Sequence, residues 1–220
     1  MLREVRDVLT KEECNTIIDY CRPRLKKSKV VGGDVVGESP ISHSHRTNSG
    51  CWIKSHDYHT QEFQEIIEKV RDTITQYSAL PSENQEYPYQ VLNYQVGEYY
   101  KLHQDYFERN NEYWKYVQST GGQRAVSILL YLNDVEEGGE IEYPHIQVKI
   151  KPEIGKMIIH QNMKENKELK ESMHEALPVL RGEKWVLVNW VRVNKYTKWG
   201  EQNVKDNKRN TNRIIRMWMF

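Results

Sequence analysis

The 220-residue chain is short of cysteine, of long apolar runs and of any excess of charge of one sign. Its three cysteines are odd in number and lack CxxC spacing, so neither a disulfide framework nor a cysteine zinc site is favoured. No stretch approaches the roughly 20 apolar residues of a membrane span, and no leader is visible. The formal net charge is +1, which gives no indication of a nucleic acid partner.

Motifs of several common enzyme classes are also absent. The chain has no GxGxxG, no GxxxxGK[ST], no GxSxG and no HExxH. These absences argue against common nucleotide-binding, hydrolase and zinc-protease classes. The length suits one domain spanning residues 1–220.

The N-terminal part carries two helix patterns. Thr10 and Glu13 have the spacing of a capping box, which predicts a helix through about Cys21. A second helix is predicted over residues 59–79. Its apolar residues recur at three- and four-residue intervals: Phe63, Ile66, Ile67, Val70 and Ile74. Residues 25–50 have little periodicity and predict a long, partly mobile loop that closes over a site.

Beyond residue 88 the pattern changes to short β-branched and aromatic runs separated by glycine, asparagine and proline. Five runs are predicted as strands: 91–100, 124–132, 146–151, 156–161 and 184–193. Helices followed by many short strands predict an α+β fold with paired sheets rather than βαβ units. The chain then divides into three parts: a helical layer with a flexible loop (1–80), a strand-rich core (88–194) and a basic C-terminal segment (195–220).

Three residues form a candidate metal site. His103 and Asp105 stand two apart, and such residues on an extended segment point to the same side. With 8 histidines and 31 acidic residues, about one such pair is expected by chance. His174 adds a second imidazole, and two histidines with one carboxylate form the facial donor set of non-haem iron(II) oxygenases. A lone histidine at the end of a strand is more often an ordinary surface or core residue than a metal ligand.

Lys184 begins the most apolar predicted strand and shares its parity with Val186, Val188 and Trp190. A lysine that faces inward needs an anion to meet it. A dicarboxylate that binds a metal at one end would supply that anion at the other. The alternative is that Lys184 lies at the solvated start of its strand, and spacing does not separate the two.

Motifs across most of the chain resemble those of the collagen-type prolyl 4-hydroxylase family, in the compact form of algae and large viruses. In chain order the matching segments are LTKEEC (9–14), RTNSGCW (46–52), YYKLHQD (99–105), GGQR (121–124), YL (131–132), EGGE (137–140) and residues 174–190. Several motifs in the correct order are far more specific than any one of them.

The resemblance implies a double-stranded β-helix, or jelly-roll, core at 88–194 with N-terminal helices packed on one side. It implies Fe(II) ligation by His103, Asp105 and His174. It also implies that Lys184 binds the distal carboxylate of 2-oxoglutarate, with Tyr94 as a hydrogen-bond partner. O2 is then the second cosubstrate, and ascorbate supports turnover.

The same resemblance places Tyr100, Arg124 and Trp190 near a substrate proline or its peptide. Two of them could instead be core aromatics, and Arg124 could cap a strand edge. One departure from the family pattern is Ile141, which stands where a threonine usually bonds the cosubstrate. We expect weaker cosubstrate binding from this change. Lys184 itself favours this family, because oxygen-sensing prolyl hydroxylases and lysyl hydroxylases generally place arginine there.

The expected activity is 2-oxoglutarate- and O2-dependent 4-hydroxylation of proline in proline-rich or collagen-like segments, with release of succinate and CO2. One alternative is the same chemistry on another residue, or on a proline in a globular protein. Another is a non-catalytic peptide-binding module.

The basic C-terminal segment, 195–220, favours a solvated end over a site for nucleic acid or an acidic partner. Its apolar last residues suggest docking on the domain or on a second copy in a homo-oligomer. The visible N-terminus favours the cytoplasm, whereas collagen-like substrates favour a secretory lumen. The sequence does not decide between these compartments.

Overall fold

The computed structural model describes residues 2–28, 45–54, 60–109 and 113–197. Its largest element is a seven-stranded sheet in the order β1-β10-β6-β15-β4-β3-β2. These strands are β1 (Leu2–Val5), β10 (Met157–Gln161), β6 (Arg124–Tyr131), β15 (Lys184–Arg192), β4 (Tyr89–Tyr94), β3 (Ser49–Ile53) and β2 (Lys26–Lys27). Strand β15 lies at the centre and pairs antiparallel with β6 and β4.

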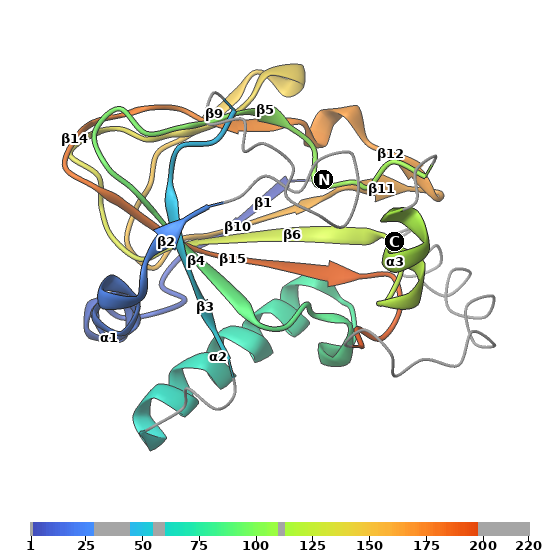
Figure 1. Cartoon of the computed structure of the whole chain (residues 1–220), viewed down its shortest axis with the longest axis horizontal. Coiled ribbons are helices and arrows are strands. Elements are labelled where there is room, and N and C mark those ends of the chain that lie inside the picture. Colours follow the sequence, from blue (N-terminus) through green and yellow to red (C-terminus); the bar gives the residue numbers. More distant parts are fainter. Residues whose placement is uncertain (1, 29–44, 55–59, 110–112, 198–220) are drawn as a thin grey trace.

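A four-stranded sheet in the order β5-β13-β8-β9 packs over one face of the large sheet (Figure 1). Its strands are β5 (Tyr100–His103), β13 (His174–Ala176), β8 (Ile141–Tyr143) and β9 (Val148–Ile150). Two short pairs complete the strands, β7 (Glu137–Gly138) with β14 (Val179–Arg181) and β11 (Met163–Lys164) with β12 (Lys167–Glu168).

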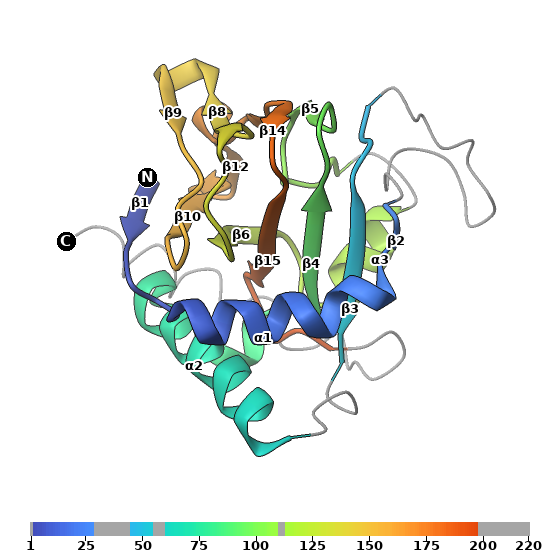
Figure 2. The same cartoon turned by 90° about the vertical axis from the view of Figure 1, so that its left-hand side faces the viewer.

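Helices cover the other face of the large sheet. Figure 2 shows α1 (Lys11–Cys21) and α2 (Gln61–Ser78) running across it. A third helix, α3 (Tyr113–Ser119), precedes β6 in the chain. Single 3₁₀ turns occur at η1 (Arg22–Arg24), η3 (Ser82–Asn84), η4 (Pro144–Ile146) and η5 (Lys170–Ser172). Among the described residues, no helix combines the length and apolarity needed to cross a membrane.

Both predicted helices are confirmed. Thr10 Oγ1 accepts from the Glu13 N–H, and the Glu13 carboxylate accepts from the Thr10 N–H, which closes the capping box of α1. The predicted apolar stripe of α2 is buried throughout. It packs with Ile17, Ile128 and Leu187 in what we call the outer core, between the helices and the large sheet.

A second cluster, the inner core, lies between the two sheets and includes Leu92, Tyr131, Ile158, Val186 and Val188. Alternate residues of β15 therefore enter different cores, because side chains along a strand alternate between its faces. The expected α+β arrangement of two sheets with helices on one side is present.

One predicted strand is wrong in its extent. Residues 91–100 form two strands, because β4 ends at Tyr94 and the chain crosses to the small sheet before β5 begins at Tyr100. Gly97 lies in this crossing with φ 80°, a conformation that glycine adopts readily. The predicted strand at 146–151 shortens to Val148–Ile150, since its first residue belongs to η4.

The N-terminal part supplies strands as well as helices. Strand β1 pairs with β10, and β3 pairs with β4, so both sides of the large sheet use residues that were expected to form a helical layer and loop. Most of the predicted mobile loop lies outside the described residues, as does most of the C-terminal segment.

The outer core makes a direct prediction about stability. Replacing Ile74, which is fully buried on α2, with alanine should lower the free energy of unfolding by about 2–5 kcal/mol, because a cavity remains. The exposed neighbour Gln76 gives the matched control, and Gln76→Ala should change it by less than about 0.5 kcal/mol. Urea unfolding measures both, and equal effects would contradict the assigned packing of α2.

Candidate active site

The structure brings His103, Asp105 and His174 together at the edge of the inner core. His103 ends β5, His174 begins β13, and the antiparallel register pairs these two residues directly. Asp105 follows β5 by two residues. One candidate ligand atom from each of the three lies within 4.8 Å of the others.

Backbone carbonyls orient both imidazoles. The Nδ1 of His103 lies 2.8 Å from the Lys101 carbonyl oxygen, and the Nδ1 of His174 lies 2.8 Å from that of Ser172. A carbonyl only accepts, so each Nδ1 carries the proton and each Nε2 keeps a lone pair for a metal ion. Burial lowers the pKa of His103 to about 3, which keeps its ring neutral.

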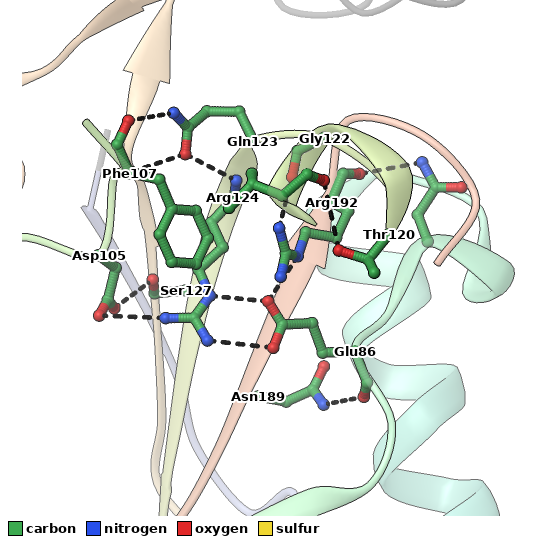
Figure 3. Close-up of polar contacts among 12 residues, drawn as sticks. Glu86, Asp105, Phe107, Thr120, Gly122, Gln123, Arg124, Ser127, Asn189 and Arg192 are labelled. Atoms are coloured by element: carbon green, nitrogen blue, oxygen red, sulfur yellow. Dashed lines mark hydrogen bonds and ion pairs between the residues drawn. The ribbon is translucent and has the colours of Figure 1, made fainter. Parts of the chain in front are cut away.

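Asp105 is held as a carboxylate. Ser127 Oγ donates to its Oδ2 at 2.6 Å, and Arg124 Nη1 lies 3.9 Å from its Oδ1 (Figure 3). Burial would raise the pKa of Asp105, but the neighbouring His174 and Arg124 outweigh it and hold the pKa below its usual value. Two imidazoles whose Nδ1 atoms are engaged by carbonyl oxygens and one ionised carboxylate suit an iron(II) site that keeps open positions.

Lys184 is buried, with 3% of its surface exposed. Its Nζ donates to the Gly139 carbonyl oxygen at 2.9 Å and lies 4.2 Å from the ring centroid of Tyr94. No carboxylate of the described residues forms a salt bridge with it, and burial lowers its pKa to about 7. Lys184 therefore faces inward and does not lie at a solvated strand end, the alternative that its sequence position left open. A bound anion would compensate its buried charge.

Tyr94 lies beside Lys184, and Ile141 belongs to the same inner core as Tyr94. Tyr94 pairs with Lys184 across β4 and β15, and burial raises its pKa to about 12, so it remains a neutral phenol. Ile141 is buried in the inner core, and its side chain has no hydrogen-bonding group. The hydroxyl that a threonine would offer there is therefore missing.

The three expected substrate residues lie close to the candidate ligands. The ring of Tyr100 stacks on His103 at 3.6 Å between centroids. The guanidinium of Arg124 lies 3.5 Å from the ring centroid of Trp190. Because Arg124 also approaches Asp105, the three residues form an aromatic and cationic border around the candidate metal site.

The sequence analysis missed a buried acid beneath this border. Glu86 accepts from Arg124 Nε at 2.7 Å and Nη2 at 3.0 Å, and it forms an ion pair with Arg192 at 2.5 Å (Figure 3). Burial would raise the pKa of Glu86, but these two guanidinium groups hold it below its usual value. Asn189 fixes the same residue by donating to its backbone carbonyl oxygen. In the sequence, the charged Arg192 at the end of an apolar strand could have indicated that a buried acid lies nearby.

A third histidine was also missed. His160 is buried on β10, and its ring centroid lies 4.8 Å from that of His174. Its alternation with Ile158 along the predicted strand would have pointed it inward. Burial lowers the pKa of His160 to about 3, so it is neutral as well.

Known proteins resemble this chain in sequence and in fold. The model of the 2OG-Fe(II) oxygenase superfamily matches residues 89–192. Prolyl 4-hydroxylase 1 of Arabidopsis thaliana is 32% identical over 202 residues, covering 86% of this chain and 67% of the relative. Prolyl 4-hydroxylase 5 of the same plant is 31% identical over 209 residues, with the same coverage of both proteins.

Solved structures agree on the fold. The viral collagen prolyl hydroxylase of Paramecium Bursaria Chlorella virus-1, solved as a 2OG complex, has a TM-score of 0.66 at 24% identity and covers 87% of this chain and 95% of that one. A prolyl-4-hydroxylase of Pseudomonas putida has a TM-score of 0.56 at 18% identity, with coverage of 87% and 91%. The jelly-roll fold is thus confirmed, and the chain belongs to the prolyl 4-hydroxylase family of 2-oxoglutarate- and iron(II)-dependent dioxygenases.

Proposed function

We propose that this dioxygenase hydroxylates carbon 4 of proline within proline-rich or collagen-like peptide segments, converting 2-oxoglutarate and O2 to succinate and CO2. Two observations carry the proposal: two oriented histidines and a carboxylate converge, and the buried Lys184 makes no salt bridge within the described part of the chain. Those two features suit the two ends of one molecule, a 2-oxo dicarboxylic acid.

The metal end of the site belongs to His103, Asp105 and His174. These residues would hold iron(II) through their Nε2 and carboxylate atoms, the donor set of non-haem iron(II) oxygenases. Iron(II), when bound there, supplies the activation of O2 that the reaction needs. Ser127 and Arg124 hold the Asp105 carboxylate in its ionised form, and the backbone carbonyls at Lys101 and Ser172 hold the imidazoles in the required tautomer.

The other end of 2-oxoglutarate fits Lys184. Its ammonium pairs with the distal carboxylate, while the Tyr94 phenol offers a hydrogen bond beside it. Because the Ile141 side chain offers no hydrogen bond, Lys184 contributes most of the attraction for the distal carboxylate. Burial strengthens that attraction, since a charge pair in low dielectric is less screened than one in water.

The peptide fits across the border formed by Tyr100, Arg124 and Trp190. Aromatic faces pack well against proline rings in a polyproline II chain, and a guanidinium donates to the peptide's carbonyl oxygens. Glu86 fixes the Arg124 guanidinium from beneath with two hydrogen bonds, so little conformational entropy is lost when a peptide binds.

The activity itself is tested by mass spectrometry of a proline-rich peptide incubated with the protein, iron(II), ascorbate and 2-oxoglutarate. We expect prolines that gain one oxygen atom, formed only with 2-oxoglutarate and abolished by His174→Ala. If 2-oxoglutarate is consumed but the peptide is not modified, the dioxygenase activity is supported and the proline-rich substrate is wrong. Loss of both would favour a non-catalytic binding module.

Binding of 2-oxoglutarate should depend on pH through Lys184. Its pKa of about 7 means that the free protein loses this charge as pH rises, so binding above pH 7 must take up a proton. The dissociation constant should rise by up to about tenfold per pH unit above 7. Calorimetry from pH 6.5 to 8.5 measures it, with Lys184→Arg as the control that stays charged. Parallel profiles for both proteins would contradict this role of Lys184.

The peptide contact of Arg124 is tested by Arg124→Lys, which keeps the charge but loses the two-pronged bond to Glu86. We expect the KM for peptide to rise roughly tenfold, equivalent to one charge-assisted hydrogen bond of about 1.4 kcal/mol. The KM for 2-oxoglutarate should stay within about twofold. Arg181→Lys, at an exposed ion pair with Glu136, is the matched control. If Arg124→Lys instead raises the iron(II) concentration needed for activity and leaves the peptide KM unchanged, Arg124 orients Asp105 and does not contact the peptide.

A further inference from the structure

His160 lies at the level of the candidate metal ligands but on the opposite sheet. Its backbone pairs with Ser127, which in turn pairs with Trp190 across β6 and β15. Residues directly opposite one another share a face of a sheet, so His160 lies on the same inner face as the serine that bonds Asp105 and the tryptophan that packs on Arg124.

The hydrogen bonds of His160 are incomplete. Its Nδ1 lies 2.8 Å from the hydroxyl of Tyr143, a fully buried residue of β8 on the small sheet. Its Nε2 is buried and, within the described part of the chain, has no hydrogen-bond partner. Buried polar groups are nearly always paired in native proteins, so an unpaired one at a binding site points to an external partner.

The same contact indicates where the proton of His160 resides. If Tyr143 donates to Nδ1, only one group remains unpaired, the N–H at Nε2. If Nδ1 donates to Tyr143 instead, both the tyrosine hydrogen and the Nε2 lone pair remain unpaired. The first arrangement leaves fewer buried groups unsatisfied, so Nε2 carries the hydrogen and seeks an acceptor.

This protonation distinguishes His160 from the metal ligands. His103 and His174 donate through Nδ1 to carbonyl oxygens and keep a lone pair at Nε2. His160 has the opposite tautomer and no lone pair to offer at Nε2. It is also outside the group of residues whose ligand atoms lie within 4.8 Å of one another.

We propose that the Nε2–H of His160 donates a hydrogen bond to the 1-carboxylate of 2-oxoglutarate, the carboxylate next to the metal. The inference rests on the proposed cosubstrate and deepens it. Lys184 binds the 5-carboxylate, and both residues project from the inner face of the large sheet, on strands separated only by β6. His160 and Lys184 thus hold the two ends of the dicarboxylate, and Tyr143 acts as a positioning residue that sets the tautomer of His160.

The test is calorimetric binding of 2-oxoglutarate to the iron(II)-loaded protein without O2, together with the visible absorption of the complex. His160→Phe retains the ring shape but removes the donor, and it should weaken 2-oxoglutarate binding about 10- to 100-fold. Iron(II) affinity, measured separately, should change less than about threefold. His160→Gln retains a side-chain N–H and should lose less, as should Tyr143→Phe.

Two comparisons make the outcome specific. His145→Phe makes the same substitution at an exposed histidine and should bind 2-oxoglutarate like the unaltered protein. Combining His160→Phe with Lys184→Met should multiply the two single losses, because the residues contact opposite ends of the ligand. Thermal unfolding of each variant identifies any that fails to fold. If His160→Phe fails to fold, the 2-oxoglutarate affinities of His160→Gln and Tyr143→Phe test the inference instead.

Each remaining outcome overturns a different statement. If His160→Phe binds 2-oxoglutarate as tightly as the unaltered protein, the inference is wrong while the proposed function stands. If it loses iron(II) affinity by the same factor as 2-oxoglutarate affinity, His160 serves the metal and not the carboxylate. If the unaltered, iron-loaded protein does not bind 2-oxoglutarate, the proposed function fails as well.

Discussion

The register of β15 is the constraint on which the rest of the structure depends. This strand is central in the large sheet, and its antiparallel pairing with β4 and β6 sets which of its residues face the inner core. A slip of one residue would turn Lys184, Val186, Val188 and Trp190 toward the helices and bring Trp185 and Leu187 into the site. Burial on both faces prevents such a slip, because the helical layer and the small sheet each require a different set of side chains. The outer core therefore helps to fix the position of Lys184 without contacting any ligand.

The inner core contains polar groups without a complete set of partners among the described residues. Lys184 lacks a carboxylate among the described residues, and the Nε2 of His160 and the hydroxyl of Tyr131 lack hydrogen bonds there. Leaving such groups unsatisfied costs about 1–3 kcal/mol each, and more for a charge. A sandwich of apolar side chains would be more stable without them. Their presence between the two sheets that carry the candidate metal ligands and Lys184 is explained by a polar ligand that satisfies them together.

The sequence predicted the parts of this site that depend on local pattern. The spacing of His103 and Asp105, the parity of Lys184 and the stripe of α2 are all properties of neighbouring residues, and each is found in the structure. The crossing between β4 and β5 was missed because β-branched and aromatic residues continue through it and only Gly97 marks the turn. Glu86, Arg192 and His160 were missed for another reason. Local pattern could at most have pointed Arg192 and His160 inward, whereas their partners, such as Glu86 for the two arginines, lie far apart in sequence and no local pattern encodes such a contact.

The two halves of the site reside on different sheets, so its geometry requires links between those sheets. His103 and His174 lie on the small sheet, whereas Lys184 lies on the large one. Hydrophobic packing sets the spacing of the sheets but is weakly directional. Two hydrogen bonds add direction, one from Ser127 to Asp105 and one between Tyr143 and His160. Both join groups beside the candidate metal site, where an error of about 1 Å would alter the reach of a short dicarboxylate between metal and lysine. The same side chains that make the inner core polar thus also fix its two sheets at the separation that the ligand needs.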